Sequence, residues 1–407
     1  MGTTAVDRDR LLDHPSFPVF WAARVLSALA FQMSAVAIGW LVYARTGSAY
    51  SLGLVGLFQF LPMVVLTLLV GHVADQYDRR RIVQICQLVE GLTLAVLAVA
   101  IFDDWLTIPG VFAAVLVLGA ARAFEQPTMA ALLPALVPAV ALPRALAISS
   151  SAVQTATIIG PSLGGLLYAV GVTAPFVIAA VFFLAACGLM TFMRLQRSVP
   201  RREPPTLRSV FSGIAFIRSR PVILGSISLD MFAVLLGGAT ALLPIYAHDI
   251  LQTGPWGLGL LRSAPAVGAL TMSAVLTRVP LRRGVGRKMF AAVIVFGAAT
   301  VVFAASTSLV VSLVALAVLG AADNVSVVIR SSLVQLLTPD EMRGRVSAVN
   351  SLFVGTSNQL GEFESGMAAG LLGAVPAGVL GGIGTIVIAL LWMRLFPGLR
   401  KTETLSG

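Results

Sequence analysis

Apolar stretches of about twenty residues, the length of a helix that crosses a bilayer, follow one another along almost the whole chain. Short segments between them hold most of the charges. Of the 407 residues, 57% are hydrophobic and only 11% are charged. A soluble chain of this length needs far more charge to cover its surface. The sequence therefore predicts an all-α integral membrane protein with twelve transmembrane helices.

The positions of the spans follow from the apolar stretches. Residues 1–17 lack the short apolar core and the cleavage site of a secretory signal, so we expect the first span to stay in the mature protein. The expected spans are 18–43, 50–73, 82–102, 107–127, 146–169, 173–193, 221–246, 255–277, 288–306, 309–335, 345–369 and 374–396.

The basic residues predict the orientation of these spans. With the N-terminus inside, the bases between spans fall almost entirely in cytoplasmic segments, and only Arg45 lies in an outer loop. The net charge of +10 therefore reflects topology. No basic domain with interleaved aromatic residues is present, so we expect no nucleic-acid partner. We expect both termini in the cytoplasm, and the composition, rich in Ala, Arg and Gly but poor in Lys, points to a bacterial inner membrane.

The longest charged segment divides the spans into six and six. It begins with several prolines, and apolar residues at helical spacing follow. This pattern predicts a linker and then an amphipathic helix on the inner leaflet. We therefore expect a six-helix bundle in residues 1–193, a cytoplasmic linker in 194–220 and a second six-helix bundle in 221–407.

The two halves repeat each other when the chain is shifted by about 200 residues. The matching residues are Pro18 with Pro221, Tyr43 with Tyr246, Gly56 with Gly259, Pro62 with Pro265, Arg79 with Arg282, Pro138 with Pro339 and Arg144 with Arg345. A parallel repeat of this kind places the substrate site between the two bundles, near the midplane of the membrane.

Residues 71–80 read Gly-His-Val-Ala-Asp-Gln-Tyr-Asp-Arg-Arg. This segment resembles the loop between the second and third helices of the major facilitator superfamily. Gln76 and Asp78 replace an arginine and a glycine of that motif, while the first glycine, the first aspartate and the last two bases match. The resemblance implies the major facilitator fold, which has two six-helix bundles related by a parallel pseudo-repeat.

The same resemblance implies a conformational switch in this loop, formed by Gly71, Asp75, Arg79 and Arg80. In the family the aspartate lies beside the N-terminus of a helix in the other half, where a carboxylate is stabilised. We assign the switch role to Asp75. We interpret Arg80 as an anchor that fixes the topology.

A second motif lies in the span 146–169. Gly160, Pro161, Gly164 and Gly165 resemble the Gly-Pro-x-x-Gly-Gly motif of exporters in the superfamily, particularly proton-coupled antiporters. Other stretches, among them residues 122–127 and 338–345, are similar to a bacterial branch of enterobactin-exporter-like and drug-efflux transporters. The resemblance implies export of a small siderophore-like or drug-like molecule.

An ionisable group at membrane depth is costly and points to function. Asp230 lies about ten residues into its span, hence about 15 Å deep, where burial disfavours the charged carboxylate. It is our preferred proton carrier, and Glu90 is the second candidate. We expect Arg262, in the next span, to be the partner of Asp230. A proton-binding site and a fixed ion pair remain alternatives for these two residues.

The spans contain further charged residues. We expect four of them to be charge partners inside the membrane: Arg24, Arg122, Glu125 and Asp323. The others are Arg330 and two acids that we place at the outer mouth, Glu362 and Glu364. Arg122 and Glu125 are three residues apart on one helix face and can pair. Arg330 is close to the inner end of its span, where its side chain can reach the interface.

These features predict a secondary transporter that works by alternating access, most simply a proton-coupled exporter. An importer or facilitator of the same fold is the alternative, and a membrane enzyme or a non-transporting sensor is less favoured, because no catalytic or nucleotide-binding motif is present. We expect no cofactor and no metal, since the two cysteines and three histidines are scattered. The expected partners are a small-molecule substrate, protons and the lipid bilayer, and we expect the protein to function as a monomer.

Overall fold

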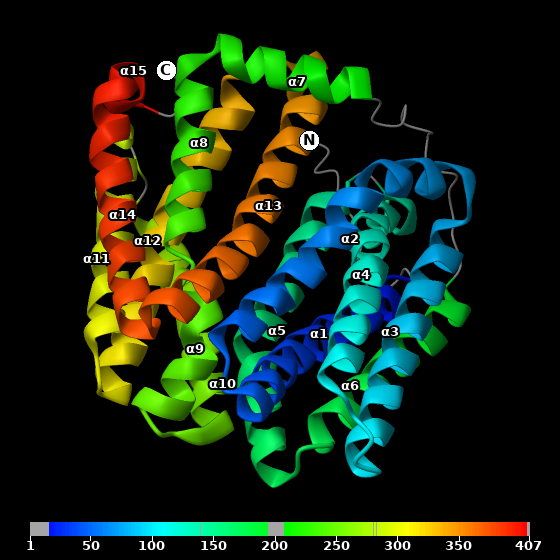
Figure 1. Cartoon of the computed structure of the whole chain (residues 1–407). Coiled ribbons are helices and arrows are strands. Elements are labelled where there is room, and N and C mark those ends of the chain that lie inside the picture. The colour runs from blue at the N-terminus through cyan, green and yellow to red at the C-terminus, as the bar shows by residue number, and fades with distance from the viewer. Residues whose placement is uncertain (1–15, 139, 194–206, 280, 282, 405–407) are drawn as a thin grey trace.

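The computed structural model describes residues 16–138, 140–193, 207–279, 281 and 283–404. In these residues it contains helices and no strand, and eleven of the helices are long and apolar enough to cross a membrane. Figure 1 shows the helices in two groups, one formed by the first half of the chain and the other by the second half. The predicted all-α membrane fold is confirmed.

The first half forms one group of helices. Side chains of Ser48, Asp78 and Thr107 accept hydrogen bonds from backbone N–H groups in the first turns of α2, α3 and α4, as N-cap residues do. The helices are α1 (Ser16–Thr46), α2 (Ala49–Gln76), α3 (Arg79–Phe102), α4 (Ile108–Leu136), α5 (Leu142–Val170) and α6 (Ala174–Phe192).

The second half begins with the amphipathic helix α7 (Leu207–Ser219), which lies across the ends of the other helices in Figure 1. Residues 194–206 of the predicted linker lie outside the described residues. The long helices that follow are α8 (Pro221–Leu236), α10 (Gly254–Arg278), α11 (Val285–Ala305), α12 (Leu309–Leu336), α13 (Asp340–Leu372) and α14 (Ala374–Leu395), and the short α15 (Pro397–Arg400) ends the fold.

The predicted span 221–246 is not one continuous helix. α8 ends at Leu236, and after Gly237 and Gly238 the chain continues as a 3-10 turn (Ala239–Leu242), the short α9 (Leu243–Ile245) and a π-helical turn (Tyr246–Ile250). Gly237 and Gly238 weaken the helix at this point. Broken backbone at membrane depth is tolerated where it lines a cavity or packs against protein, and both conditions hold here.

The helix α13 contains the predicted span 345–369, but it is not among the eleven apolar helices. Its 33 residues would easily cross a bilayer, and its sequence is the most polar of the long helices. α13 packs between α2 and α8. Its polar side chains therefore lie against protein and a cavity, where a low hydropathy costs little.

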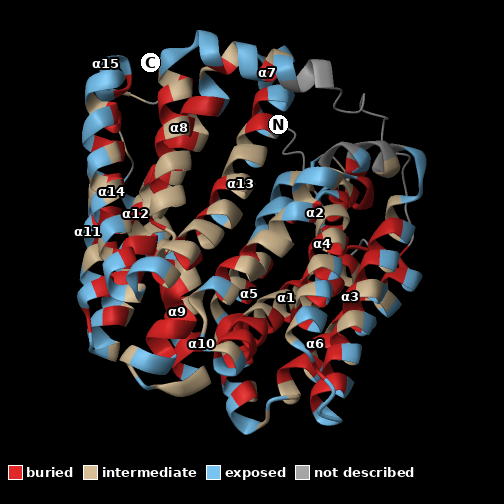
Figure 2. Ribbon diagram, viewed as in Figure 1, coloured by how far each residue is buried: buried red, intermediate tan, exposed pale blue. Residues whose placement is uncertain are grey.

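The outer surface of the helices is apolar. Figure 2 shows exposed residues along the outward faces of α3, α6 and α14, with buried residues on the faces that meet other helices. Val96 and Val99 of α3 and Val387 and Leu390 of α14 are each more than half exposed. Apolar surface of this extent is suited to lipid.

The two groups of helices meet along two pairs, α2 with α13 and α5 with α10. Gly53 packs against Gly366 in the first pair, and Gly165 packs against Pro255 and Gly259 in the second. Small residues let two helices approach closely. The predicted repeat relates these pairs, since α2 corresponds to α10 and α5 to α13.

Candidate functional site

A cavity of about 560 Å³ lies between the two groups of helices. Its walls come from α1, α5, α8, α10, α11, α12 and α13, and from the backbone of residues 237–240, where α8 is broken. The polar and charged side chains in its wall include Gln32, Gln154, Thr240, Arg262, Asp323 and Glu362. The volume is that of a site for a drug-sized molecule.

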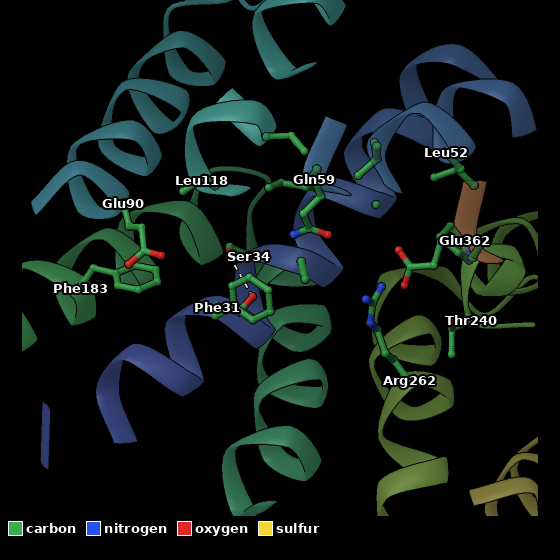
Figure 3. Close-up of a pocket in the computed structure, with 17 residues that line it drawn as sticks. Phe31, Ser34, Leu52, Gln59, Glu90, Leu118, Phe183, Thr240, Arg262 and Glu362 are labelled. Carbon is green, nitrogen blue, oxygen red and sulfur yellow. Dashed lines mark hydrogen bonds between the residues drawn. The ribbon is translucent and has the colours of Figure 1, made fainter. Parts of the chain in front are cut away.

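A narrower compartment extends from this cavity into the first group of helices. The two share Phe31, Thr240, Arg262 and Glu362. Figure 3 shows Glu90 and Phe183 at one end of the narrower compartment, Phe31 in the middle, and Arg262 and Glu362 at the other end. The cavity and its extension therefore connect residues of both halves.

Arg262 and Glu362 face each other across the junction of α10 and α13. Figure 3 shows the guanidinium of Arg262 directed toward the carboxylate of Glu362, and the two side chains interact electrostatically. The sequence placed Glu362 at an outer mouth, and in the structure its side chain lies in the wall of the cavity between the two halves. One turn further along α13, Gly366 packs on Gly53 of α2, so the two helices are in close contact next to Glu362.

Asp230 is paired with Arg330 of α12, and not with Arg262 as the sequence led us to expect. Both side chains are buried, with 6% and 5% of their surface exposed, so Arg330 does not extend to the interface. The expectation failed because α8 packs on α12, α13 and α14. Arg262 on α10 faces α13 instead.

The first group of helices contains a second set of buried charges. The carboxylate of Glu125 accepts hydrogen bonds from Ser27 at 2.5 Å, Gln87 at 3.1 Å and Arg122 at 2.5 Å. The predicted pair of Arg122 with Glu125 is thus confirmed. Arg24 interacts electrostatically with both members of this pair.

Glu90 lies in the wall of the narrower compartment with only 1% of its surface exposed. One of its carboxylate oxygens has no hydrogen-bond partner in the described part of the chain. Arg122 and Glu125 both act on it electrostatically. Of the two predicted proton carriers, Glu90 borders the cavity, whereas Asp230 is held by its own cation.

The exporter-like motif lies where α1, α5 and α10 meet. A Cβ atom at Gly160 would lie 2.6 Å from Gln32, and one at Gly164 would lie 2.7 Å from the carbonyl oxygen of Met33. Gly165 packs against α10, and Pro161 lines the cavity. The motif therefore supports the close packing of α5 on α1 and α10.

The predicted switch loop is described only in part, because the side chains of Gly71 and Asp75 lie outside the described residues. Arg79 donates a hydrogen bond to the carbonyl oxygen of Ala131 at 3.3 Å, and Arg80 donates one to that of Met193 at 2.8 Å. Both arginines therefore tie the start of α3 to neighbouring helices. The switch role of Asp75 stays a prediction.

Sequence reasoning missed a contact between the halves at the end of the molecule remote from α7. The hydroxyl of Tyr43 on α1 donates a hydrogen bond to Asp249 of the π-helical turn. His248 contacts the other oxygen of Asp249 at 2.6 Å and packs on Trp40. In the sequence, the polar residues His248 and Asp249 at the end of an apolar span could have indicated this contact. Glu364, the other predicted outer acid, contacts the hydroxyl of Ser365 at 3.4 Å.

The fold resembles solved transporter structures. A nucleoside transporter, NupG, has a TM-score of 0.68 with 15% identity and covers 93% of this chain and 98% of its own. A bacterial homologue of the human lysosomal transporter Spinster has a TM-score of 0.70 with 13% identity, covering 95% and 96%. At such identities the likeness shows the fold.

The sequence comparisons give the family. Residues 11–406 match the family described as transmembrane secretion effector. An enterobactin exporter of Citrobacter koseri is 25% identical over 96% of this chain and 94% of its own. A multidrug efflux pump, Tap, of Mycobacterium bovis is 28% identical over 96% of this chain and 95% of its own. The chain therefore belongs to the transmembrane secretion effector family, a branch of the major facilitator superfamily of membrane transporters.

Proposed function

We propose that the protein is a proton-coupled exporter that moves a small amphiphilic molecule, siderophore-like or drug-like, by alternating access. The observation that carries this proposal is the charged cavity between the two halves, closed on one side by α2–α13 and α5–α10. A site between two repeats that opens to one side at a time is the basis of secondary transport. The relatives named as exporters support the outward direction.

The proposed location is the inner membrane of a bacterium, with both termini in the cytoplasm. The helix α7, which precedes α8, then lies on the cytoplasmic side. In Figure 1 the long helices converge at the end opposite α7, where α9 and the turn that follows it lie. With this proposed orientation the cavity opens toward the cytoplasm, and we assign the structure to the inward-facing state, in which substrate enters from the cytoplasm.

The proposed proton carriers are Glu90 and Asp230. Glu90 is the better placed, because it borders the cavity and one of its carboxylate oxygens has no hydrogen-bond partner among the described residues. Asp230 faces Arg330, and a nearby cation favours the charged carboxylate. Proton uptake at Asp230 therefore requires that the ion pair opens during the cycle.

The test is proton flux in liposomes that contain the purified protein. A pH gradient is imposed and a catecholate siderophore or an amphiphilic drug is added, for the wild type and for Glu90→Gln and Asp230→Asn. We expect ligand-dependent proton movement that is lost in Glu90→Gln. Glu364→Gln is the matched control, since Glu364 is outside the cavity wall, and it should transport like the wild type.

Two other outcomes are informative. Loss of proton movement only in Asp230→Asn would identify Asp230, in the ion pair of the second half, as the proton carrier. Ligand transport that proceeds without any proton movement would refute proton coupling and leave a facilitator.

A further inference from the structure

Most charges in the interior of the described helices have a partner of opposite sign. The side chains are brought together from different helices or from successive turns of one helix. The pairs are Arg122 with Glu125, Asp230 with Arg330, and Arg262 facing Glu362. These pairs add no net charge to the interior.

The two remaining charges of the first half also balance. Glu90 lies in the field of Arg122, and Arg24 lies in the field of Glu125. With the Arg122–Glu125 pair they form a group of two cations and two anions. The part of the cavity that the first half surrounds is therefore neutral as well.

Among the charged side chains that line the cavity, Asp323 of α12 is the exception. It lies 14 residues after the start of its 28-residue helix, which is near mid-membrane. Its side chain lines the cavity, and no ion pair or hydrogen bond reaches it from the described residues. Arg330 is the nearest base on its own helix, and Asp230 already neutralises it. The cavity thus holds one negative charge that no charged side chain among the described residues compensates.

An aromatic ring lines the same two spaces as this carboxylate. Phe296 and Asp323 line the same small pocket between α8, α11 and α12 and also the main cavity. Leu316 and Leu319 extend the apolar wall on the same helix as Asp323. A cation is attracted both by a carboxylate and by the face of an aromatic ring. The apolar part of a bound organic cation would pack on the two leucines.

We propose that the transported molecule is an organic cation with an apolar or aromatic body, whose charge lies against Asp323 and Phe296. This inference rests on the proposed function and narrows its substrate class. A monovalent cation makes the occupied cavity neutral, whereas an anionic catecholate siderophore adds charge of the same sign as Asp323. Like charges in one site disfavour binding.

The test is equilibrium binding to the purified full-length protein in detergent, without a gradient. Tetraphenylphosphonium, triphenylphosphine oxide and tetraphenylborate have similar bodies and carry a positive, zero and negative charge. Each is titrated separately by calorimetry. We expect the cation to bind more tightly than the neutral compound, and the anion to bind least.

Variants of the protein test whether the charge of Asp323 is responsible for the preference for the cation. Asp323→Asn should weaken tetraphenylphosphonium binding by about tenfold, the equivalent of one charge contact in a partly screened site, and should leave binding of triphenylphosphine oxide unchanged. Asp323→Glu keeps the charge and should retain cation binding. Glu364→Gln removes an acid outside the cavity wall and should bind all three compounds like the wild type.

The outcomes separate this inference from the proposed function. Equal affinity for the cation and the anion, or unchanged cation binding in Asp323→Asn, would overturn it even if proton-driven export of a siderophore were observed. Asp323-dependent cation binding without any proton-driven transport would support it and count against the proposed exporter. Binding of the neutral compound shows that a variant is folded.

Discussion

The ion pair of Asp230 with Arg330 is a residue-scale feature with a measurable consequence. Both side chains are buried, and removal of one partner leaves the other charged and unpaired. We expect Arg330→Met to lower the free energy of unfolding by about 3–5 kcal/mol, the usual cost of breaking a buried pair from one side. Thermal unfolding of the purified protein in detergent measures this change.

Two further variants test whether a loss of stability comes from the unpaired charge. Asp230→Asn combined with Arg330→Met removes both charges and should recover much of the stability. Arg394→Met replaces an exposed arginine near the end of α14 and should unfold like the wild type. If Arg330→Met were as stable as Arg394→Met, the two side chains would not form a pair in the folded protein.

The break after α8 is a property of a structural element. A Cβ atom at Gly238 would lie 2.7 Å from both the carbonyl oxygen of Gly361 and the hydroxyl of Ser365. We expect Gly238→Ala to destabilise the protein by about 1–3 kcal/mol, as overpacking does, and to reduce transport, because the broken backbone lines the cavity. Thermal unfolding and liposome transport check the two effects.

Gly188 provides the matched control for this prediction. It lies within α6, and a Cβ atom there would meet no other atom within 4 Å. Gly188→Ala should therefore keep the wild-type stability, or raise it slightly through its helix propensity. Equal behaviour of Gly188→Ala and Gly238→Ala would show that α13 does not pack closely on the break.

At the scale of the whole molecule, the contact of Tyr43 with Asp249 joins the two halves on the closed side. Alternating access requires this contact to open. We expect Tyr43→Cys with Asp249→Cys, in a chain whose Cys86 and Cys187 are replaced by Ala, to be joined by a short bifunctional thiol reagent. The cross-link should stop transport, and reduction of a cleavable reagent should restore it.

Single-cysteine variants treated with the same reagent are the control and should keep transporting. Transport that persists in the fully cross-linked protein would contradict the requirement that the halves separate on this side. Mass spectrometry of a digest measures the cross-linked fraction.

The amino-acid sequence by itself determined the membrane fold, most span positions, the amphipathic helix and the Arg122–Glu125 pair. These depend on properties that are local in the chain: the hydropathy of about twenty consecutive residues or the spacing of side chains on one helix. The span 345–369, which lies within the polar α13, was predicted in the same way as the other spans.

Only the tertiary structure decided which charges from different helices meet. Asp230 pairs with Arg330 and Arg262 faces Glu362, because each pairing depends on how helices rotate about their axes and which helices are neighbours, and sequence order does not set either. That Asp323 has no partner among the described residues could likewise be recognised only from the tertiary structure. A charge can be recognised as uncompensated only after every helix that could neutralise it has been placed.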